Sequence, residues 1–300
     1  MTYTEVQERN GKRYYYRVMS IRKGDKISKK RKYLGVDLDL KKLKQLEKEA
    51  DEIINVSLNK LLKKNEIKKL SLIKNTYSKL PKSTFENRYE TFLAQFTYDS
   101  NAIEGNTLTL QETSFILFEQ RTPKGKSIRE INEVLNHKEA FDYILQHDED
   151  ISKKLICEVQ KIVVKGTLRK DLESQIGKYR LVQVYVRGSN FIPPSPILAK
   201  KEMRNLLRWY SLNKQKLHPL ILAAYFHLAF ESIHPFVDGN GITGRLLMNF
   251  ILHKNGFPMI NIPNKIKLDY YSCLDKGRNG DLRTLVKLLY DLLIKGNFLV

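Results

Sequence analysis

Residues 234–245, HPFVDGNGITGR, bring an imidazole, a carboxylate, three glycines and a guanidinium together within twelve consecutive positions. Residues 220–233 before this run are apolar with helical spacing, and residues 246–252 after it have the pattern of a second helix. The run therefore predicts a loop that joins one helix to the start of the next. Backbone N–H groups at a helix start attract phosphate, so the loop is a candidate anion site.

Two simpler interpretations of this run have to be weighed. Asp-Gly and Asn-Gly pairs are common turn formers, and a connection between helices needs turn residues. Asp238, Asn240 and Gly241 also match positions three, five and six of a calcium-binding EF-hand loop, but Phe236 and Leu247 would then fall at ligand positions one and twelve. Neither side chain can bind calcium, which excludes the EF-hand. The histidine before the proline and the arginine inside the next helix distinguish the run from a plain turn.

The run resembles the signature of the Fic family: His, Pro or another residue, Phe, any residue, Asp or Glu, Gly, Asn, Gly or Lys, Arg, two residues, Arg. Eleven of the twelve positions are compatible. The departure is Ile242, which stands where the family has its first motif arginine. The resemblance implies an all-α fold, a Fic-type helical bundle with a small β-hairpin flap. It also implies transfer of AMP from ATP to a Ser, Thr or Tyr hydroxyl of a target protein or of the chain itself.

Residues 100–106, SNAIEGN, are similar to the inhibitory helix motif of Fic proteins: Ser or Thr, three residues, Glu, then Gly or Asn. Ser100 and Glu104 are spaced i to i+4, so both would lie on one helix face. Taken alone, this spacing is more typical of a solvated helix face. Its position before the core resembles the family class with an N-terminal inhibitory helix, here near residues 93–105.

The resemblance gives a role to each part of the run. His234 would be the general base, because an imidazole with an ordinary pKa of about 6.5 accepts a hydroxyl proton near neutral pH. Asp238 would hold Mg²⁺, and Arg245 would pair the γ-phosphate unless Glu104 occupies it. Removal of AMP from a modified protein, with Glu104 aligning water, is left open. The implied nucleotide-binding residues are Asp238, Gly239, Asn240, Gly241, Ile242, Thr243, Gly244, Arg245, Tyr270 and Tyr271.

Residues 177–194, GKYRLVQVYVRGSNFIPP, alternate valines with polar residues and end in two prolines, which predicts a short two-stranded hairpin. A surface hairpin without a role fits the same pattern. In the resemblance it is the flap that pairs with an extended segment of the target protein. The flap residues are Val184, Tyr185, Val186, Arg187 and Gly188.

A tyrosine pair opens a later helix that runs to the Gly280-Asp281 turn. Tyrosines at helical spacing usually belong to a core, whereas the family places such a pair, here Tyr270 and Tyr271, beside the adenine. Arg278 stands where some relatives have an asparagine.

The N-terminal segment is strongly basic: residues 1–34 contain 11 Lys or Arg against 3 Asp or Glu, within a chain of formal net charge +20. Turns at Asn10-Gly11 and residues 23–25 predict a three-stranded β-meander with Tyr14, Tyr16 and Val18 on one face. Basic residues between tyrosines suit a nucleic-acid backbone, and a solvated sheet packed on the core fits equally well.

The chain is expected to divide into a basic β module at 1–36, a helical linker at 37–82 and a Fic-like core at 83–300. One Lys-rich helix is expected over residues 38–79. Cys157 and Cys273 are far apart and suggest neither a disulfide nor a zinc site. No membrane segment or targeting signal is visible, so a cytoplasmic location is expected.

ATP and Mg²⁺ are the implied substrate and cofactor, and a homodimer follows from the resemblance only. Because Ile242 removes a positive charge, the alternative function is a catalytically impaired nucleotide-binding regulator whose basic N-terminal module binds nucleic acid.

Overall fold

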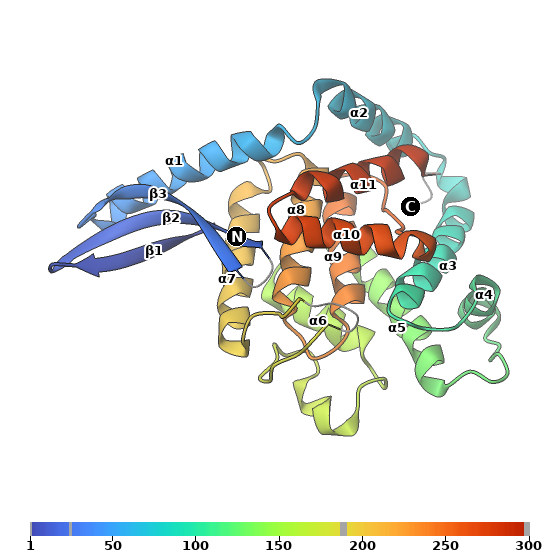
Figure 1. Cartoon of the computed structure of the whole chain (residues 1–300). Helices are drawn as coiled ribbons and strands as arrows, with labels where there is room; N and C mark the ends of the chain where they lie inside the picture. The colour runs from blue at the N-terminus through green and yellow to red at the C-terminus, as the bar shows by residue number, and fades with distance from the viewer. Residues whose placement is uncertain (1, 24–25, 187–190, 297–300) are drawn as a thin grey trace.

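A computed structural model describes residues 2–23, 26–186 and 191–296 of the chain (Figure 1). Within these residues a three-stranded sheet is followed by eleven α-helices. The predicted fold class, a helical bundle preceded by a small β-meander, is confirmed. The strands are β1 Thr2–Arg9, β2 Lys12–Lys23 and β3 Lys26–Val36. The helices are α1 Leu40–Asn59, α2 Lys64–Ser78, α3 Phe85–Ile103, α4 Leu110–Glu119, α5 Ile128–Leu145, α6 Lys153–Val163, α7 Pro196–Asn213, α8 Pro219–Ile233, α9 Asn240–Lys254, α10 Lys267–Arg278 and α11 Leu282–Lys295.

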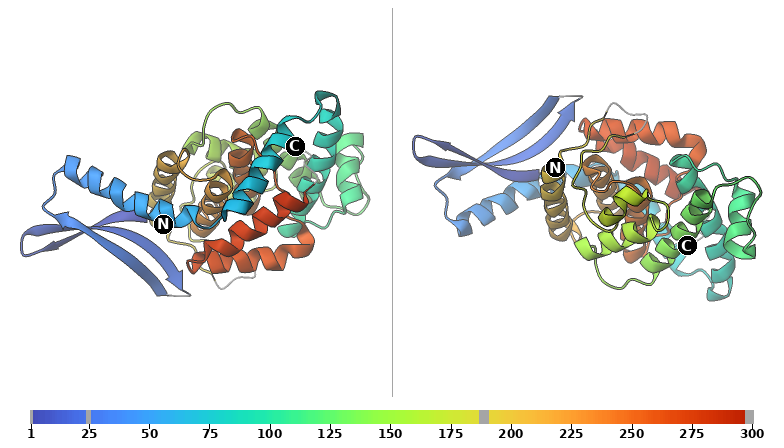
Figure 2. Two further views of the ribbon diagram at one scale, coloured as in Figure 1. Left: turned by 90° about the horizontal axis from the view of Figure 1, so that it is seen from above. Right: turned by 90° about the horizontal axis from the view of Figure 1, so that it is seen from below.

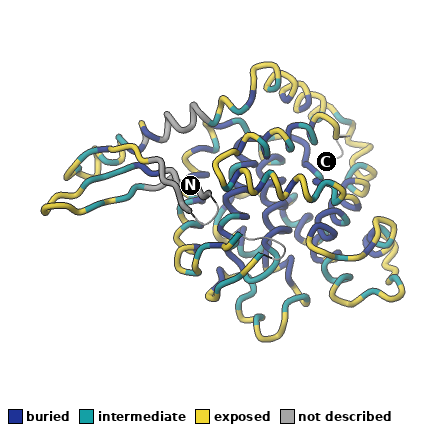
Figure 3. Tube along the Cα trace, viewed as in Figure 1, coloured by how far each residue is buried: buried dark blue, intermediate teal, exposed yellow. Residues whose placement is uncertain are grey.

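Helices α8 and α9 form the centre of the helical body. Helix α8 packs against α7, α10 and α11, and α9 packs against α3, α5 and α6. Both central helices are apolar around most of their circumference, which is typical of a helix buried on all sides. The burial map shows the same arrangement, with buried residues concentrated in this pair (Figure 3). The loop 234–245 therefore begins at the end of α8 and continues into the first turns of α9, inside a rigid frame.

The N-terminal strands form the predicted antiparallel meander, in the order β1-β2-β3. Asn10 and Gly11 both have positive φ, 51° and 73°, as a tight turn between twisted strands requires. The ring centroids of Tyr16 and Tyr33, which are cross-strand partners, lie 5.4 Å apart. The sheet and α1 extend to one side of the helical body in all three views (Figures 1 and 2).

Glu47 of α1 joins the sheet to the helical body. Its carboxylate accepts a hydrogen bond from Thr4 of β1 and lies 3.7 Å from the guanidinium of Arg17 of β2. The other carboxylate oxygen lies 3.4 Å from Arg208 of α7. The Arg17–Glu47 pair is shielded from solvent, because the two side chains are 8% and 12% exposed, whereas Arg208 is 63% exposed. Val18 is also fully buried, so the sheet packs on its neighbours through part of its surface.

The single helix expected over residues 38–79 is wrong, because the structure has two helices there. The break falls at residues 60–63, where Leu62 turns inward and is 5% exposed. The backbone N–H of Lys63 then donates to the Glu66 carboxylate at 2.8 Å, which starts α2. The sequence of residues 38–79 contains neither Gly nor Pro. The helix is interrupted there because Leu62 is buried and a new helix begins after Lys63. None of the helices within the described residues is long and apolar enough to cross a membrane.

Candidate active site

His234 ends α8 in the left-handed conformation, with φ 50° and ψ 62°. Its backbone N–H donates to the carbonyl of Phe230 at 2.9 Å and closes the helix. Pro235 follows, and a proline after a left-handed residue prevents the helix from continuing. The imidazole is thereby placed at the point where the chain turns toward α9.

The turn is held by the side chain of Asn240. Its oxygen accepts from the Phe236 backbone N–H and its amide donates to the Phe236 carbonyl, both at 2.9 Å. The Phe236 ring is fully buried and lies 5.5 Å from the Tyr179 ring, centroid to centroid. The buried ring anchors the loop to the helical body. The Asn240 side chain thus holds the loop, and its expected role in phosphate binding stays a prediction.

Asp238 lies on the open side of the same turn, with its side chain 46% exposed. Its Oδ1 accepts from the Gly239 N–H at 2.7 Å, and its backbone carbonyl accepts from Gln160 of α6 at 3.1 Å. Gly239 has φ 76°, and a Cβ there would meet Val164 at 2.7 Å. Only glycine fits this position, so the turn depends on close packing against the end of α6.

Arg245 points back from α9 to α3. Its Nε donates to Ser100 Oγ at 3.0 Å, and its Nη2 donates to the Ser100 carbonyl and to Glu104 Oε1, both at 2.8 Å. Arg245 is 1% exposed, whereas the Glu104 side chain is 42% exposed. A Cβ at Gly241 would fall 2.0 Å from Glu104 Oε1. The Glu104 carboxylate therefore lies directly on the backbone at the start of α9.

Burial, and after it the positive charge of Arg278, lowers the pKa of the His234 imidazole from its usual value to about 4. The imidazole is thus neutral at neutral pH. Burial and the negative charge of Glu104 raise the pKa of Glu231, three residues earlier on α8, to about 7, although Arg245 opposes this shift. The charge of Arg278 thus acts on both the neutral imidazole of His234 and the carboxyl of Glu231.

Comparison with known families agrees with this geometry. The model of the Fic/DOC family matches residues 150–252, which include the whole run 234–245. Residues 150–252 therefore form a Fic/DOC domain. We call residues 234–245 the Fic loop.

The chain is similar to three proteins that are named as Fic proteins. Protein adenylyltransferase Fic of Nematostella vectensis is 40% identical over 200 residues, which cover 65% of this chain and 45% of that protein. A Fic domain containing signaling protein from Bacteroides thetaiotaomicron has a TM-score of 0.68 at 29% identity. The match covers 77% of this chain and 94% of the Bacteroides chain. A fragment of Fic-1 from C. elegans has a TM-score of 0.66 at 29% identity, covering 86% and 76%. The chain spans less than half the length of the Nematostella vectensis protein.

Ile242 occupies the middle of the first turns of α9 in the Fic loop. It is 7% exposed and belongs to the main apolar core, so its side chain packs inward. Thr243 is also fully buried, and a Cβ at Gly244 would meet Glu231 Oε1 at 2.4 Å. These three positions are therefore packing positions between α9 and its neighbours. Positive charge on this helix start comes from Arg245.

The tyrosine pair of α10 divides into a buried and an open residue. Tyr270 is 1% exposed, and its hydroxyl lies 2.7 Å from His227 Nε2. Tyr271 is 39% exposed and donates to the carbonyl of Ile103 at 3.1 Å. The Tyr270 ring lies in the core, and Tyr271 is the more exposed tyrosine of the pair. Their place beside the adenine stays a prediction. Tyr271 also ties α10 to the end of α3.

The predicted pairing of strands in the flap is absent from its described residues, 177–186 and 191–194. Two side chains connect its arms instead: Arg180 donates to the carbonyls of Val182 and Pro194, and Gln183 donates to that of Pro193 at 3.0 Å. Prolines lack the N–H group that a strand ladder needs, which explains the difference. Val184, Tyr185 and Val186 lie on the first arm, and Tyr185 is 74% exposed. Arg187 and Gly188 lie outside the described residues.

Sequence reasoning missed three residues that shape the Fic loop. Gln160 fixes the Asp238 backbone, Arg180 donates to the His234 carbonyl at 2.8 Å, and Glu231 is buried beside α9. Gln160 and Arg180 lie more than fifty positions from the loop, so no local spacing could connect them to it. Glu231 precedes His234 by almost one helical turn, and this i to i+3 spacing is the one signal that could have indicated it.

Proposed function

We propose that the chain is a protein adenylyltransferase restrained by Glu104. The observation that carries this proposal is the Glu104 carboxylate, which lies on the start of α9 and pairs Arg245 2.8 Å away. A helix start with a buried arginine is a site for phosphate. An internal carboxylate in the same place prevents a triphosphate from binding there in its productive position. The names of the relatives support the same activity.

His234 is placed to take the proton of the target hydroxyl. The buried imidazole is neutral, so a lone pair is available at neutral pH without prior loss of a proton. As the proton of the target hydroxyl passes to the imidazole, the hydroxyl oxygen forms a bond to the α-phosphorus of ATP. The bond from that phosphorus to the oxygen bridging to the β-phosphorus breaks. Diphosphate leaves with the electron pair of the broken bond.

Asp238 and Arg245 would hold the charged part of the nucleotide. The described residues contain no cluster of three His, Cys, Asp or Glu side chains. One half-exposed carboxylate nonetheless suits Mg²⁺, which is commonly bound by one or two carboxylates together with phosphate oxygens and water. When bound, Mg²⁺ supplies positive charge against the phosphates. Arg245 would turn from Glu104 to the γ-phosphate as a two-pronged donor.

The target protein would approach along the flap. Leu181, Tyr185 and Ile192 are exposed on its two arms, 81%, 74% and 46% respectively. Exposed apolar side chains on an extended segment support recognition of an extended stretch of target. Because the chain has 16 tyrosines, self-modification on a tyrosine is an accessible first substrate.

The test is transfer of label from α-labelled ATP with Mg²⁺ to the chain itself and to a cell extract. We expect label with Glu104→Gly and little with the unaltered chain. The double variant Glu104→Gly, His234→Ala should transfer none while it still binds ATP. If Glu104→Gly binds ATP yet labels nothing, the nucleotide-binding regulator becomes the better description.

A further inference from the structure

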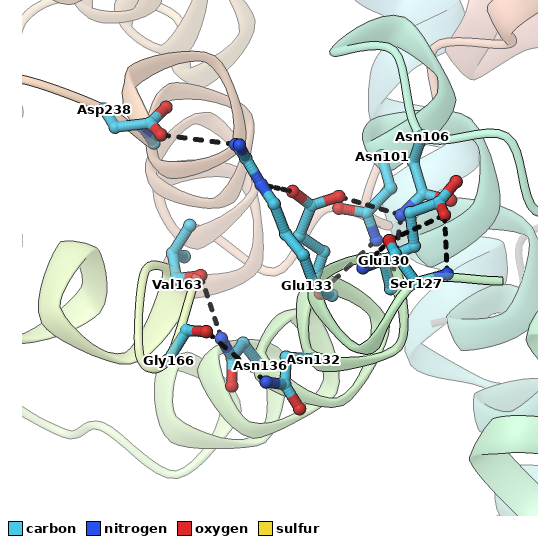
Figure 4. Close-up of polar contacts among 12 residues, drawn as sticks. Asn101, Asn106, Ser127, Glu130, Asn132, Glu133, Asn136, Val163, Gly166 and Asp238 are labelled. Atoms are coloured by element: carbon cyan, nitrogen blue, oxygen red, sulfur yellow. Dashed lines mark hydrogen bonds and ion pairs between the residues drawn. The ribbon is translucent and has the colours of Figure 1, made fainter. Parts of the chain in front are cut away.

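A chain of polar contacts connects Asp238 with the segment that follows Glu104 (Figure 4). It runs through two residues of α5: Arg129 faces Asp238, and Glu133 contacts Asn106. Arg129 Nη2 lies 3.6 Å from Asp238 Oδ2, and Arg129 Nε donates to Glu133 Oε1 at 3.0 Å. The other Glu133 oxygen accepts from the Asn106 side chain at 2.8 Å.

Arg129 is held in place by the same segment that carries Glu104. Asn106 lies two residues beyond Glu104, and its side chain also donates to the Glu130 carbonyl at 3.1 Å. Its backbone N–H donates to the Asn101 carbonyl at 3.0 Å, at the end of α3. Glu133 is therefore held by Asn106, in the segment 104–106 that also carries Glu104. In turn, Glu133 holds the guanidinium of Arg129 toward Asp238.

Both carboxylate oxygens of Asp238 have partners in this state. Oδ1 accepts from the Gly239 N–H at 2.7 Å, and Oδ2 faces Arg129. A hard divalent cation needs a carboxylate oxygen directed at it and is repelled by a neighbouring guanidinium. The Asp238 oxygen that does not accept the Gly239 N–H is thus the one that Arg129 faces.

We propose that Arg129 is a second inhibitory group, which occupies Asp238 and opposes loading of the metal–nucleotide complex. This inference rests on the proposed function, since it concerns the same nucleotide site. Glu104 acts on the arginine side of that site, and Arg129 acts on its carboxylate side. The segment 104–106 contributes to both contacts, because Glu104 pairs Arg245 and Asn106 holds Glu133.

The expected effect is moderate because the Arg129 side chain is 60% exposed. Ion pairs between exposed groups are weak, and solvent screens them. Removal of the guanidinium should tighten binding of a divalent cation with ATP by about two- to five-fold, in keeping with such weak pairs. The gain should shrink at high salt.

The test is titration of Mn²⁺·ATP, followed by calorimetry and by the Mn²⁺ paramagnetic signal, with every variant in the full-length Glu104→Gly chain. Arg129→Ala should bind Mn²⁺·ATP more tightly than the parent and bind ATP in EDTA no more tightly. Arg121→Ala is the matched control, because Arg121 is another exposed arginine paired with a carboxylate, that of Glu119 at 3.1 Å. It should change nothing. In an Asp238→Asn background the gain from Arg129→Ala should disappear.

Unchanged Mn²⁺·ATP affinity in Arg129→Ala would reject the inference and leave the proposed function intact. Weaker binding would also overturn it, and would identify Arg129 as a phosphate ligand instead. A gain that persists with Asp238→Asn would show that the effect does not pass through that carboxylate. If the parent Glu104→Gly chain binds no Mn²⁺·ATP at all, the proposed function itself fails, together with this inference.

Discussion

Glu104 lies so close to Gly241 that a Cβ atom at position 241 would fall 2.0 Å from the Glu104 carboxylate oxygen. The first residues of α9 thus accommodate an anion that belongs to the chain itself. Because the position has no side chain, the backbone at the helix start is open to either a carboxylate or a phosphate. The two anions are expected to compete for one place.

Gly241→Ala should therefore fail to activate the proposed transfer, although it must displace Glu104. The added methyl group stands where the phosphate would lie. In the Glu104→Gly chain we expect Gly241→Ala to weaken ATP affinity on the order of ten-fold, a cost typical of a lost phosphate contact. Calorimetric titration with ATP and Mg²⁺ measures this. An ATP affinity equal to that of Glu104→Gly alone would show that phosphate does not contact residue 241.

Ile242→Arg should increase transfer in the Glu104→Gly chain, since it adds a positive charge beside the developing diphosphate. One preorganised donor contributes roughly 3 kcal/mol to lowering such a barrier, or about a hundred-fold in rate. The new side chain replaces a buried isoleucine, so the melting temperature should fall by a few degrees. Initial rates of label transfer measure the first effect, and a thermal melt measures the second. Lower stability without faster transfer would show that the isoleucine does not limit the rate.

Asn240→Ala should loosen the Fic loop without touching the nucleotide directly. The substitution removes two hydrogen bonds to the Phe236 backbone and leaves its buried groups unsatisfied, at a cost of about 2 kcal/mol or more. Urea unfolding should show this loss, and transfer in the Glu104→Gly chain should fall. Asn255→Ala is a suitable control, because that side chain caps the end of α9 with a single bond to Ile251, 2.7 Å away. Its effect on transfer should be small.

Stability should decline as the solution becomes acidic. Burial lowers the pKa of His137 and His227 to about 3 and that of His218 and His234 to about 4. Below about pH 6.5 the unfolded chain binds protons that the folded chain does not, so folding loses up to about 1.4 kcal/mol per pH unit for each histidine.

Glu231 acts in the opposite direction, because its pKa is raised to about 7 and its folded form keeps a proton that the unfolded form loses. Glu231→Gln should consequently make the acid loss between pH 7 and 4.5 steeper than in the unaltered chain. Urea midpoints at pH 7.5, 6 and 5 test both statements. Flat stability across this range would contradict the burial of these histidines.

The helices and the Fic loop could be predicted from the sequence because local rules govern them. Apolar spacing placed α8 to within one residue and located the middle of α9, which begins six residues earlier than the apolar pattern. The Asn10-Gly11 pair located the first hairpin turn. The break before Lys63 depends on burial of Leu62, and the arms of the flap are joined by side chains of Arg180 and Gln183. Those features depend on contacts between distant residues, which a single sequence does not display.

Arg180 links the flap to the histidine in one further respect. Its backbone N–H donates to the Pro235 carbonyl at 2.8 Å, while its side chain donates to the carbonyls of His234, Val182 and Pro194. A buried guanidinium is thus bonded to both arms of the flap and to the peptide that carries the imidazole. Arg180 would thus fix the position of a polypeptide docked along the flap relative to His234. We expect the modified hydroxyl to be chosen by its distance along the docked strand.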